Sequence, residues 1–244
     1  MRRICRYLPL PVLLLASIQL AGAQSLIDIN MGFGAAQDKA TGNGIEGDYT
    51  LANAANFGGS CTLGVSTDPT CEKTSALSGF MLGFGANLML WEHFGVGMDV
   101  TFEPNRPTYA SVPAESLGGV LEQPALNFLS RTTFYEFNGI WQPWKSEKAE
   151  FQLIGGFGAA SIKTYENETV SGSLLGSSSS SSYLAGSSTH LNLHGGVAFQ
   201  YYLTDHFYLR PQFDIHYVPN LSQFGSKLVT EEMVWVGYTI GDRK

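Results

Sequence analysis

The sequence predicts an all-β protein: an eight-stranded antiparallel up-and-down transmembrane β-barrel with four long extracellular loops and three short periplasmic turns. Three observations lead to this fold class. Eight segments alternate apolar with small or polar residues, which is the period-two pattern of a strand that has two different faces. Short and long connections alternate strictly along the chain, and aromatic residues cluster beside the short ones.

The first 23 residues have the pattern of a cleaved export signal. Arg2, Arg3 and Arg6 precede an apolar run over residues 8–20, and Ala21-Gly-Ala23 supplies the small residues of a cleavage site. The apolar run is short for an uncleaved membrane anchor, which is the alternative interpretation. We therefore expect a signal peptide over residues 1–23 and an outer-membrane β-barrel domain over residues 24–244.

The mature chain is acidic. Removing the signal takes away three arginines and no acidic residue, so the formal net charge changes from −7 to −10. This balance disfavours nucleic acid as a partner, since nucleic-acid binding needs clustered Lys and Arg.

The eight predicted strands each have one apolar face, and their other face consists mainly of Gly, Asn, Gln and Thr with a few carboxylates. Pro211 interrupts one of them, and because proline cannot donate to a strand ladder, we expect a bulge there. The predicted strands cover residues 27–34, 80–90, 94–103, 135–141, 151–159, 191–201, 207–217 and 234–240.

The connections predict which ends of the strands lie together. Alternate connections of an up-and-down sheet lie at the same end, so the three short turns share one end and the four long loops share the other. The short turns are 91–93, 142–148 and 204–206, and the long loops are 37–76, 104–127, 164–187 and 218–230.

Aromatic side chains near the short turns predict a girdle at the periplasmic interface of the membrane. A soluble eight-stranded barrel, such as a lipocalin, is the alternative, but it would need a charged outer face. The small, uncharged second face of these strands suits a narrow barrel interior instead. The predicted girdle consists of Trp91, Phe94, Trp141, Trp144, Tyr201 and Phe207.

Two stretches, Tyr135-Glu-Phe-Asn-Gly139 and Gly195-Gly-Val-Ala-Phe-Gln-Tyr-Tyr202, together with the strand pattern, resemble small outer-membrane barrels of the OmpA/OmpX type. The resemblance implies a place in the outer membrane of a Gram-negative-type bacterium. It also implies contact with outer-membrane lipids and lipopolysaccharide, and insertion by the barrel-assembly machinery. Such barrels commonly finish on an aromatic residue, whereas this sequence continues from Tyr238 to Lys244.

Polar residues on the inward face are the candidate site. Arg210 is the one strand arginine that clearly faces inward, and a buried charge must be paired, so we expect a network of Arg210 with Glu136, Asp99 or Asp214. The network either plugs the barrel or gates a narrow pore.

Other candidate sites are weaker. Cys61 and Cys71 lie ten residues apart in one polar loop of an exported chain, which predicts a disulfide. His190 and His194 lie about 13 Å apart along one strand, too far to bind one metal together. We therefore predict no catalytic, cofactor-binding or metal-binding residues, and no cofactor. The serine run over residues 177–182 is expected to be a flexible loop segment.

The sequence thus favours a non-enzymatic outer-membrane protein with a structural or surface-interaction role through its long loops, for an unknown extracellular ligand. One alternative is a small pore or a conduit for hydrophobic solutes. The other is a lipid-modifying enzyme that uses His190 or His194.

Overall fold

In a computed structural model of the chain, twelve strands are assigned and no helix is found within the described residues. The described residues are 26–38, 72–73, 78–106, 108–112, 116–117, 121–122, 125–171, 178–219 and 227–241. This part of the chain contains no helix long and apolar enough to cross a membrane. The strands are β1 (Leu26–Asp38), β2 (Glu72–Lys73), β3 (Ser78–Met89), β4 (Phe94–Phe102), β5 (Thr108–Val112), β6 (Ser116–Leu117), β7 (Leu121–Glu122), β8 (Ala125–Lys145), β9 (Ala149–Ser171), β10 (Ser178–Tyr202), β11 (Phe207–Tyr217) and β12 (Leu228–Ile240).

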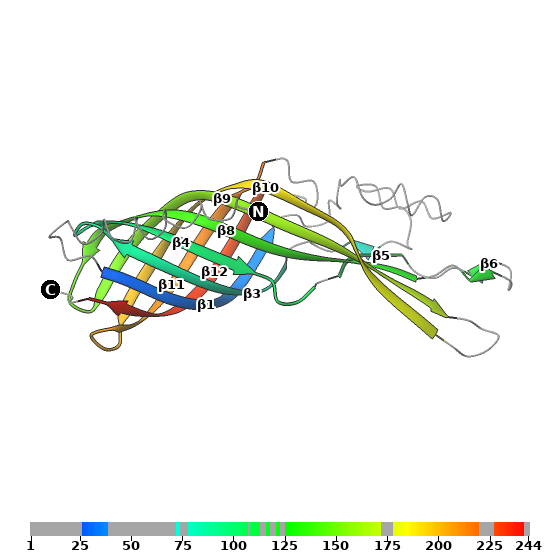
Figure 1. Cartoon of the computed structure of the whole chain (residues 1–244), viewed down its shortest axis with the longest axis horizontal. Coiled ribbons are helices and arrows are strands. Elements are labelled where there is room, and N and C mark those ends of the chain that lie inside the picture. Colours follow the sequence, from blue (N-terminus) through cyan, green and yellow to red (C-terminus); the bar gives the residue numbers. More distant parts are fainter. Residues whose placement is uncertain are drawn as a thin grey trace, which may run out of the picture.

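Eight of these strands close into a barrel (Figure 1). Each of β1, β3, β4, β8, β9, β10, β11 and β12 pairs antiparallel with the next, and β12 pairs with β1 to close the sheet. The closing register pairs Ile27 with Ile240 and Asp38 with Val229. The predicted eight-stranded, antiparallel, up-and-down barrel is therefore confirmed.

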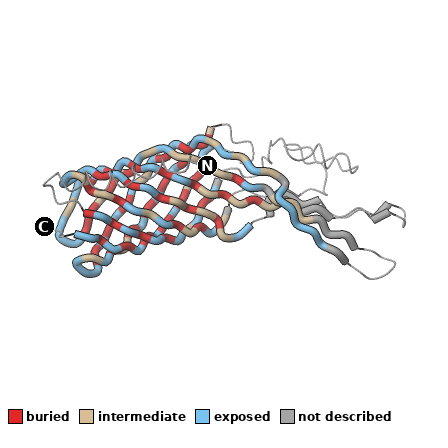
Figure 2. The backbone as a smooth tube through the Cα atoms, viewed as in Figure 1, coloured by how far each residue is buried: buried red, intermediate tan, exposed pale blue. Residues whose placement is uncertain are grey.

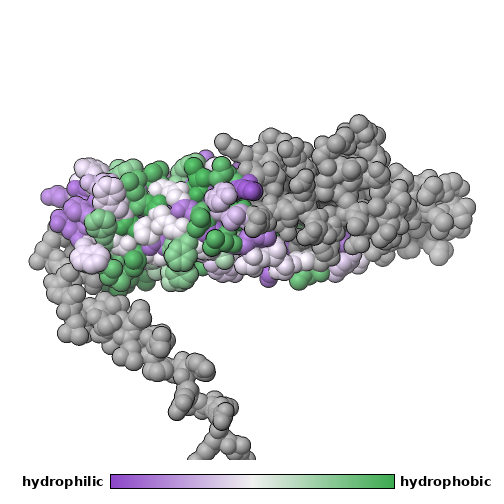
Figure 3. Space-filling view, turned by 90° about the horizontal axis from the view of Figure 1, so that it is seen from above, coloured by the Kyte–Doolittle hydropathy of each residue, from purple (hydrophilic) through white to green (hydrophobic). Residues whose placement is uncertain are grey.

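Within the barrel wall, burial alternates along the strands, and the buried residues form a regular lattice in Figure 2. In β4 the apolar residues Phe94, Val96 and Met98 are exposed, while the glycines between them and then Asp99 and Thr101 are buried. Figure 3 shows hydrophobic side chains spread over the visible barrel wall. The barrel is thus apolar outside and polar inside, the arrangement of membrane barrels and the reverse of a lipocalin.

Some large apolar side chains nevertheless lie inside, and Trp235 is the largest of those described. The indole of Trp235 on β12 is buried, and it lies across Gly32 of β1 and Gly83 of β3. A Cβ atom at Gly83 would lie 2.5 Å from Trp235 Cη2, and one at Gly32 would lie 2.7 Å from Trp235 Cδ2. These two positions need glycine because the indole fills the space that a side chain would take.

The short turns lie at one end of the barrel, as predicted. They follow β3, β8 and β10, and each is closed by backbone hydrogen bonds, such as Trp91 N to Phe94 O (3.1 Å) and Leu203 N to Phe207 O (2.8 Å). All six aromatics of the predicted girdle are exposed around this end. Two of them, Phe94 and Trp141, stack with ring centroids 6.4 Å apart.

The long-loop end differs from expectation, because three strands continue past the barrel as a projecting sheet (Figure 1). Residues 164–171 belong to β9 and residues 178–187 to β10, where the sequence predicted one long loop. Ser178–Ser182 lie in β10 as well, so the prediction of a flexible serine segment was wrong for these residues. Pairing with residues 167–171 of β9 holds them in a ladder, although a run of serines has no period-two pattern.

Pro211 does not cause a bulge. The β11–β12 register runs without a shift through the pair Pro211 and Val234. Towards β10 the register is also constant, but pairing is interrupted between Ala198–Gln212 and Tyr201–Leu209. The missing N–H of proline is therefore accommodated by a local gap in the ladder, and no extra residue is needed. The predicted bulge was wrong for this reason.

The predicted signal peptide and the predicted disulfide between Cys61 and Cys71 lie outside the described residues.

Candidate functional site

The interior of the barrel is polar and rich in acidic groups. Among the described residues, seven carboxyl side chains are buried but only one arginine, Arg210. Two histidines, His194 and His216, are buried with them. Buried charge is costly unless it is paired or neutralised by a proton or a cation. The buried carboxyl groups are Asp28, Asp99, Glu103, Glu136, Glu150, Asp214 and Glu231.

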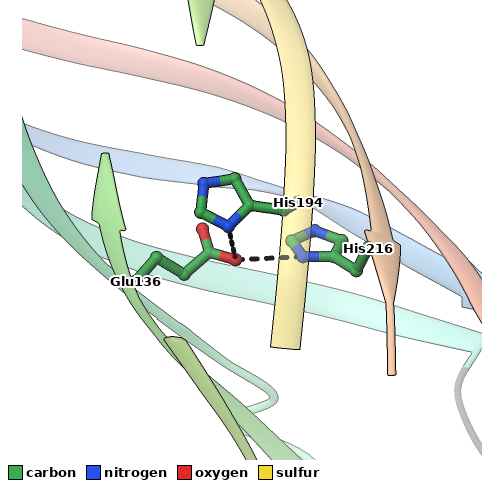
Figure 4. Close-up of side chains that lie close together, drawn as sticks. All are labelled: Glu136, His194 and His216. Atoms are coloured by element: carbon green, nitrogen blue, oxygen red, sulfur yellow. Dashed lines mark ion pairs between the residues drawn. The ribbon is translucent and has the colours of Figure 1, made fainter. Parts of the chain in front are cut away.

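Three of these side chains converge from different strands, and we call them the Glu–His–His cluster: Glu136 of β8, His194 of β10 and His216 of β11 (Figure 4). Glu136 Oε1 lies 2.9 Å from His216 Nδ1 and 3.3 Å from His194 Nδ1. One ligand atom from each residue falls within 4.8 Å of the other two.

Register and glycine together explain why these residues meet. His194 and His216 are directly opposite each other in the β10–β11 ladder. Glu136 lies on β8, which pairs with the other edge of β9, and it is opposite Gly158. Asn138, the next inward-facing residue of β8, is opposite Gly156. A Cβ at Gly156 would lie 2.9 Å from His194 Cε1. Because β9 carries glycine here, Glu136 reaches across that strand to the two histidines.

A second set of polar groups orients the two imidazoles. Asn138 Nδ2 donates to Asp99 Oδ2 (2.6 Å), so Asn138 Oδ1 faces His194 Nε2 at 2.7 Å. An amide oxygen only accepts, so His194 Nε2 carries a proton, and in the neutral imidazole the lone pair is on Nδ1.

His216 is held in a similar way. Its Nε2 lies 3.0 Å from Glu231 Oε2, while Thr101 Oγ1 donates to that same carboxylate oxygen (3.3 Å). The ring of Phe134 stacks on His216 with centroids 4.6 Å apart. The carboxylate of Glu231 favours a proton on Nε2 and leaves Nδ1 directed at Glu136.

The structure brings the predicted network together only in part. Arg210, Glu136, Asp99 and Asp214 are all buried, and Asp99 is paired in register with Glu136. Within the described part of the chain, however, no ion pair joins Arg210 to a carboxylate.

Arg210 has other neighbours. Its guanidinium lies over the ring of Trp235, 5.3 Å from the centroid, and its Nη1 lies 2.5 Å from the Asn87 amide, whose oxygen accepts when the amide is turned to suit. Asp214 accepts a hydrogen bond from Gln212 Nε2 (2.7 Å). The partners of Glu136 are the histidines and Asn192, whose Nδ2 donates to Glu136 Oε1 (2.7 Å).

His190, the other histidine considered from the sequence, does not join the cluster. Its Nε2 lies 3.1 Å from Ser188 Oγ on the same strand, beyond the part of β10 that pairs with β11.

Sequence reasoning missed the pairing of His194 with His216. The sequence comparison above was between His194 and His190 on one strand. The period-two pattern of the strands also places His194 and His216 at inward positions. A signal was available, since the short turn at 203–206 sets the β10–β11 register and places residues 194 and 216 opposite each other.

No protein-family model and no curated protein matches this sequence. Several solved barrels are similar in structure at low identity. Ail of Yersinia pestis, in complex with the heparin analogue sucrose octasulfate, gives a TM-score of 0.45 at 11% identity, over 89% of this chain and 99% of that chain. The N-terminal β-barrel domain of Pseudomonas aeruginosa OprF gives 0.39 at 11% identity, over 89% and 98%. The outer-membrane protein OprG of the same organism gives 0.39 at 17% identity, over 89% and 96%.

Proposed function

We propose that this chain is an integral outer-membrane barrel without enzymatic activity, whose projecting sheet presents an interaction surface outside the cell. The observation that carries the proposal is the inverted polarity of the barrel, with exposed Phe, Met, Val and Leu side chains around a polar interior. A wall of this kind is stable in lipid, and a closed sheet leaves no unpaired backbone edge there.

The role at the surface rests on the asymmetry of the two ends. The turn end closes with a few residues per turn, whereas β8, β9 and β10 have 21, 23 and 25 residues against 9 in β4 and 11 in β11. Outer-membrane barrels have short turns on the periplasmic side of the membrane and longer connections outside the cell. β11 pairs with β10 only from Leu193 to the turn end of β10, so the projecting part of β10 has no partner from β11 along that edge. A sheet edge of this kind can pair with an extended segment of another protein.

Labelling of intact cells tests this orientation. Ser181→Cys on the projecting sheet should react with a membrane-impermeant maleimide, while Asp205→Cys in a short turn should react only after lysis; both residues are exposed. The experiment uses a Cys61→Ser, Cys71→Ser background so that only the introduced thiol is read. Labelling of both positions, or of Asp205→Cys alone, in intact cells would refute the orientation.

Enzymatic activity has little support in the described interior. His190 with Ser188 is the nearest arrangement to a nucleophile with a base, and His190 shares the inward face of β10 with Asn192 and His194. A lipid substrate would contact the outer wall instead. Unchanged lipid A in cells that express the chain, measured by mass spectrometry, is the expected result, and a modified lipid A would contradict it.

A further inference from the structure

We propose that the Glu–His–His cluster binds one divalent transition-metal ion of the zinc type inside the barrel, through His194 Nδ1, His216 Nδ1 and the Glu136 carboxylate. Two imidazoles and a carboxylate are a common ligand set for Zn²⁺. Imidazole ligands favour zinc and its neighbours over Mg²⁺ and Ca²⁺, which prefer all-oxygen sites.

The distances fit a shared centre. Ligand atoms 2.0–2.2 Å from a tetrahedral ion lie roughly 3.3 Å from one another. The Glu136 Oε1 to His194 Nδ1 distance is 3.3 Å, and the distance to His216 Nδ1 is 2.9 Å. The two imidazoles are within 4.8 Å at their ligand atoms, so a small side-chain rotation closes them on an ion.

The hydrogen-bond pattern supplies independent support. His194 Nδ1 is buried and makes no hydrogen bond, although Glu136 Oε1 is 3.3 Å away. The proton on His194 Nε2, fixed by Asn138 and through it by Asp99, leaves a lone pair on Nδ1 directed at a carboxylate oxygen. Two lone pairs that face each other are stabilised by a cation between them.

The outer groups match those of known metal sites. A metal-bound histidine usually donates its other N–H to a carboxylate, carbonyl or water, which fixes the ring. Asn138 Oδ1 takes this part for His194, and Glu231 Oε2 lies 3.0 Å from His216 Nε2, where it can take the same part after a small rotation. Asn192 lies beside the centre, with Nδ2 2.7 Å from Glu136 Oε1 and 3.3 Å from His216 Nδ1. Turning its amide would bring Oδ1 there as a fourth ligand.

The charge of the interior also favours a cation. Seven buried carboxyl groups against one arginine, counted over the described residues, leave an excess of negative charge that a divalent ion reduces. The bound ion would join β8, β10 and β11, so its effect would be to stabilise the closed barrel.

The test is metal binding by the full mature chain, refolded into detergent micelles after chelation in denaturant. We expect one zinc ion per chain by elemental mass spectrometry after removal of excess metal. Replacement by Co²⁺ should give the visible absorption of a tetrahedral site. The boiled-against-unboiled gel shift should move to higher temperature with zinc, because an ion that binds only the folded state stabilises it.

Three variants assign the site. His194→Gln and His216→Gln should lose stoichiometric zinc and the zinc-dependent thermal shift. Glu231→Gln, which perturbs an orienting group, should weaken zinc binding about 10- to 100-fold. His190→Gln is the matched control on the same strand and face, and it should bind zinc as the unaltered chain does.

In the binding measurements, two results would overturn the proposal: an unaltered chain that binds no stoichiometric zinc, or zinc retained in His194→Gln and His216→Gln. If those variants do not fold, zinc-edge X-ray absorption of the unaltered chain decides, since the site requires two imidazole ligands. Spectra without two imidazoles would also refute it.

Discussion

The membrane-facing wall can be tested by placing a charge on it at two depths. Met98 and Leu203 are both well exposed, at 54% and 59%. Met98 lies in β4, four residues beyond Phe94 at the turn end, and Leu203 lies in the turn after β10. The perturbation is Met98→Arg, with Leu203→Arg as its control.

The expected magnitudes follow from depth. A strand rises about 3.4 Å per residue, and a tilt near 40° reduces this to roughly 2.6 Å along the barrel axis. Met98 is therefore about 10 Å above the turn-end aromatics, close to the middle of an apolar band about 25 Å tall. Arginine there should cost about 2–4 kcal/mol of unfolding free energy, whereas arginine at the interface should cost about 0–1 kcal/mol.

Reversible urea unfolding in phospholipid bilayers, followed by tryptophan fluorescence, measures both changes. The difference between the two variants is the decisive quantity, because both add the same charge to an exposed apolar position. On a soluble barrel both substitutions would stay within about 0.5 kcal/mol of the unaltered chain. Equal effects of Met98→Arg and Leu203→Arg would refute a membrane-facing wall.

Three further predictions concern the interior and the ladder. Gly83→Ala should lower the free energy of unfolding by about 1–3 kcal/mol, because the new Cβ would contact the Trp235 indole. In a double-mutant cycle measured by urea unfolding, Trp235→Phe should recover part of this loss, and additive effects would contradict the contact. Pro211→Ala should keep the fold and lower the free energy of unfolding by only about 0.4–1 kcal/mol, because the ladder to β10 is already interrupted there. A larger loss would show that Pro211 has another role. In planar bilayers the chain should show no stable conductance, since Thr101 Oγ1 of β4 donates to Glu231 Oε2 of β12 (3.3 Å) across the interior. Regular single-channel steps would favour the pore instead.

Much of the fold was predictable because successive residues of a barrel strand alternate between the outward and the inward face. Phe80, Phe84 and Leu88 could be assigned outward, and Asn87 inward, from the sequence alone, and the structure agrees. The order of strands followed in the same way, because short turns force antiparallel neighbours. Strand length was not predictable at 178–187, because this serine-rich stretch has no period-two pattern and its strand conformation comes from pairing with β9.

The sequence by itself determined which residues face inward, because alternation depends only on neighbours along the strand. It placed Glu136, His194, His216 and Arg210 inside, yet could not say which of them meet. That choice was made by the tertiary structure, because register and missing side chains act across strands. The β10–β11 register sets His194 opposite His216, and Gly156 and Gly158 leave the space through which Glu136 reaches them. Arg210, which the β11–β12 register pairs with Trp235, lies against that indole and the Asn87 amide.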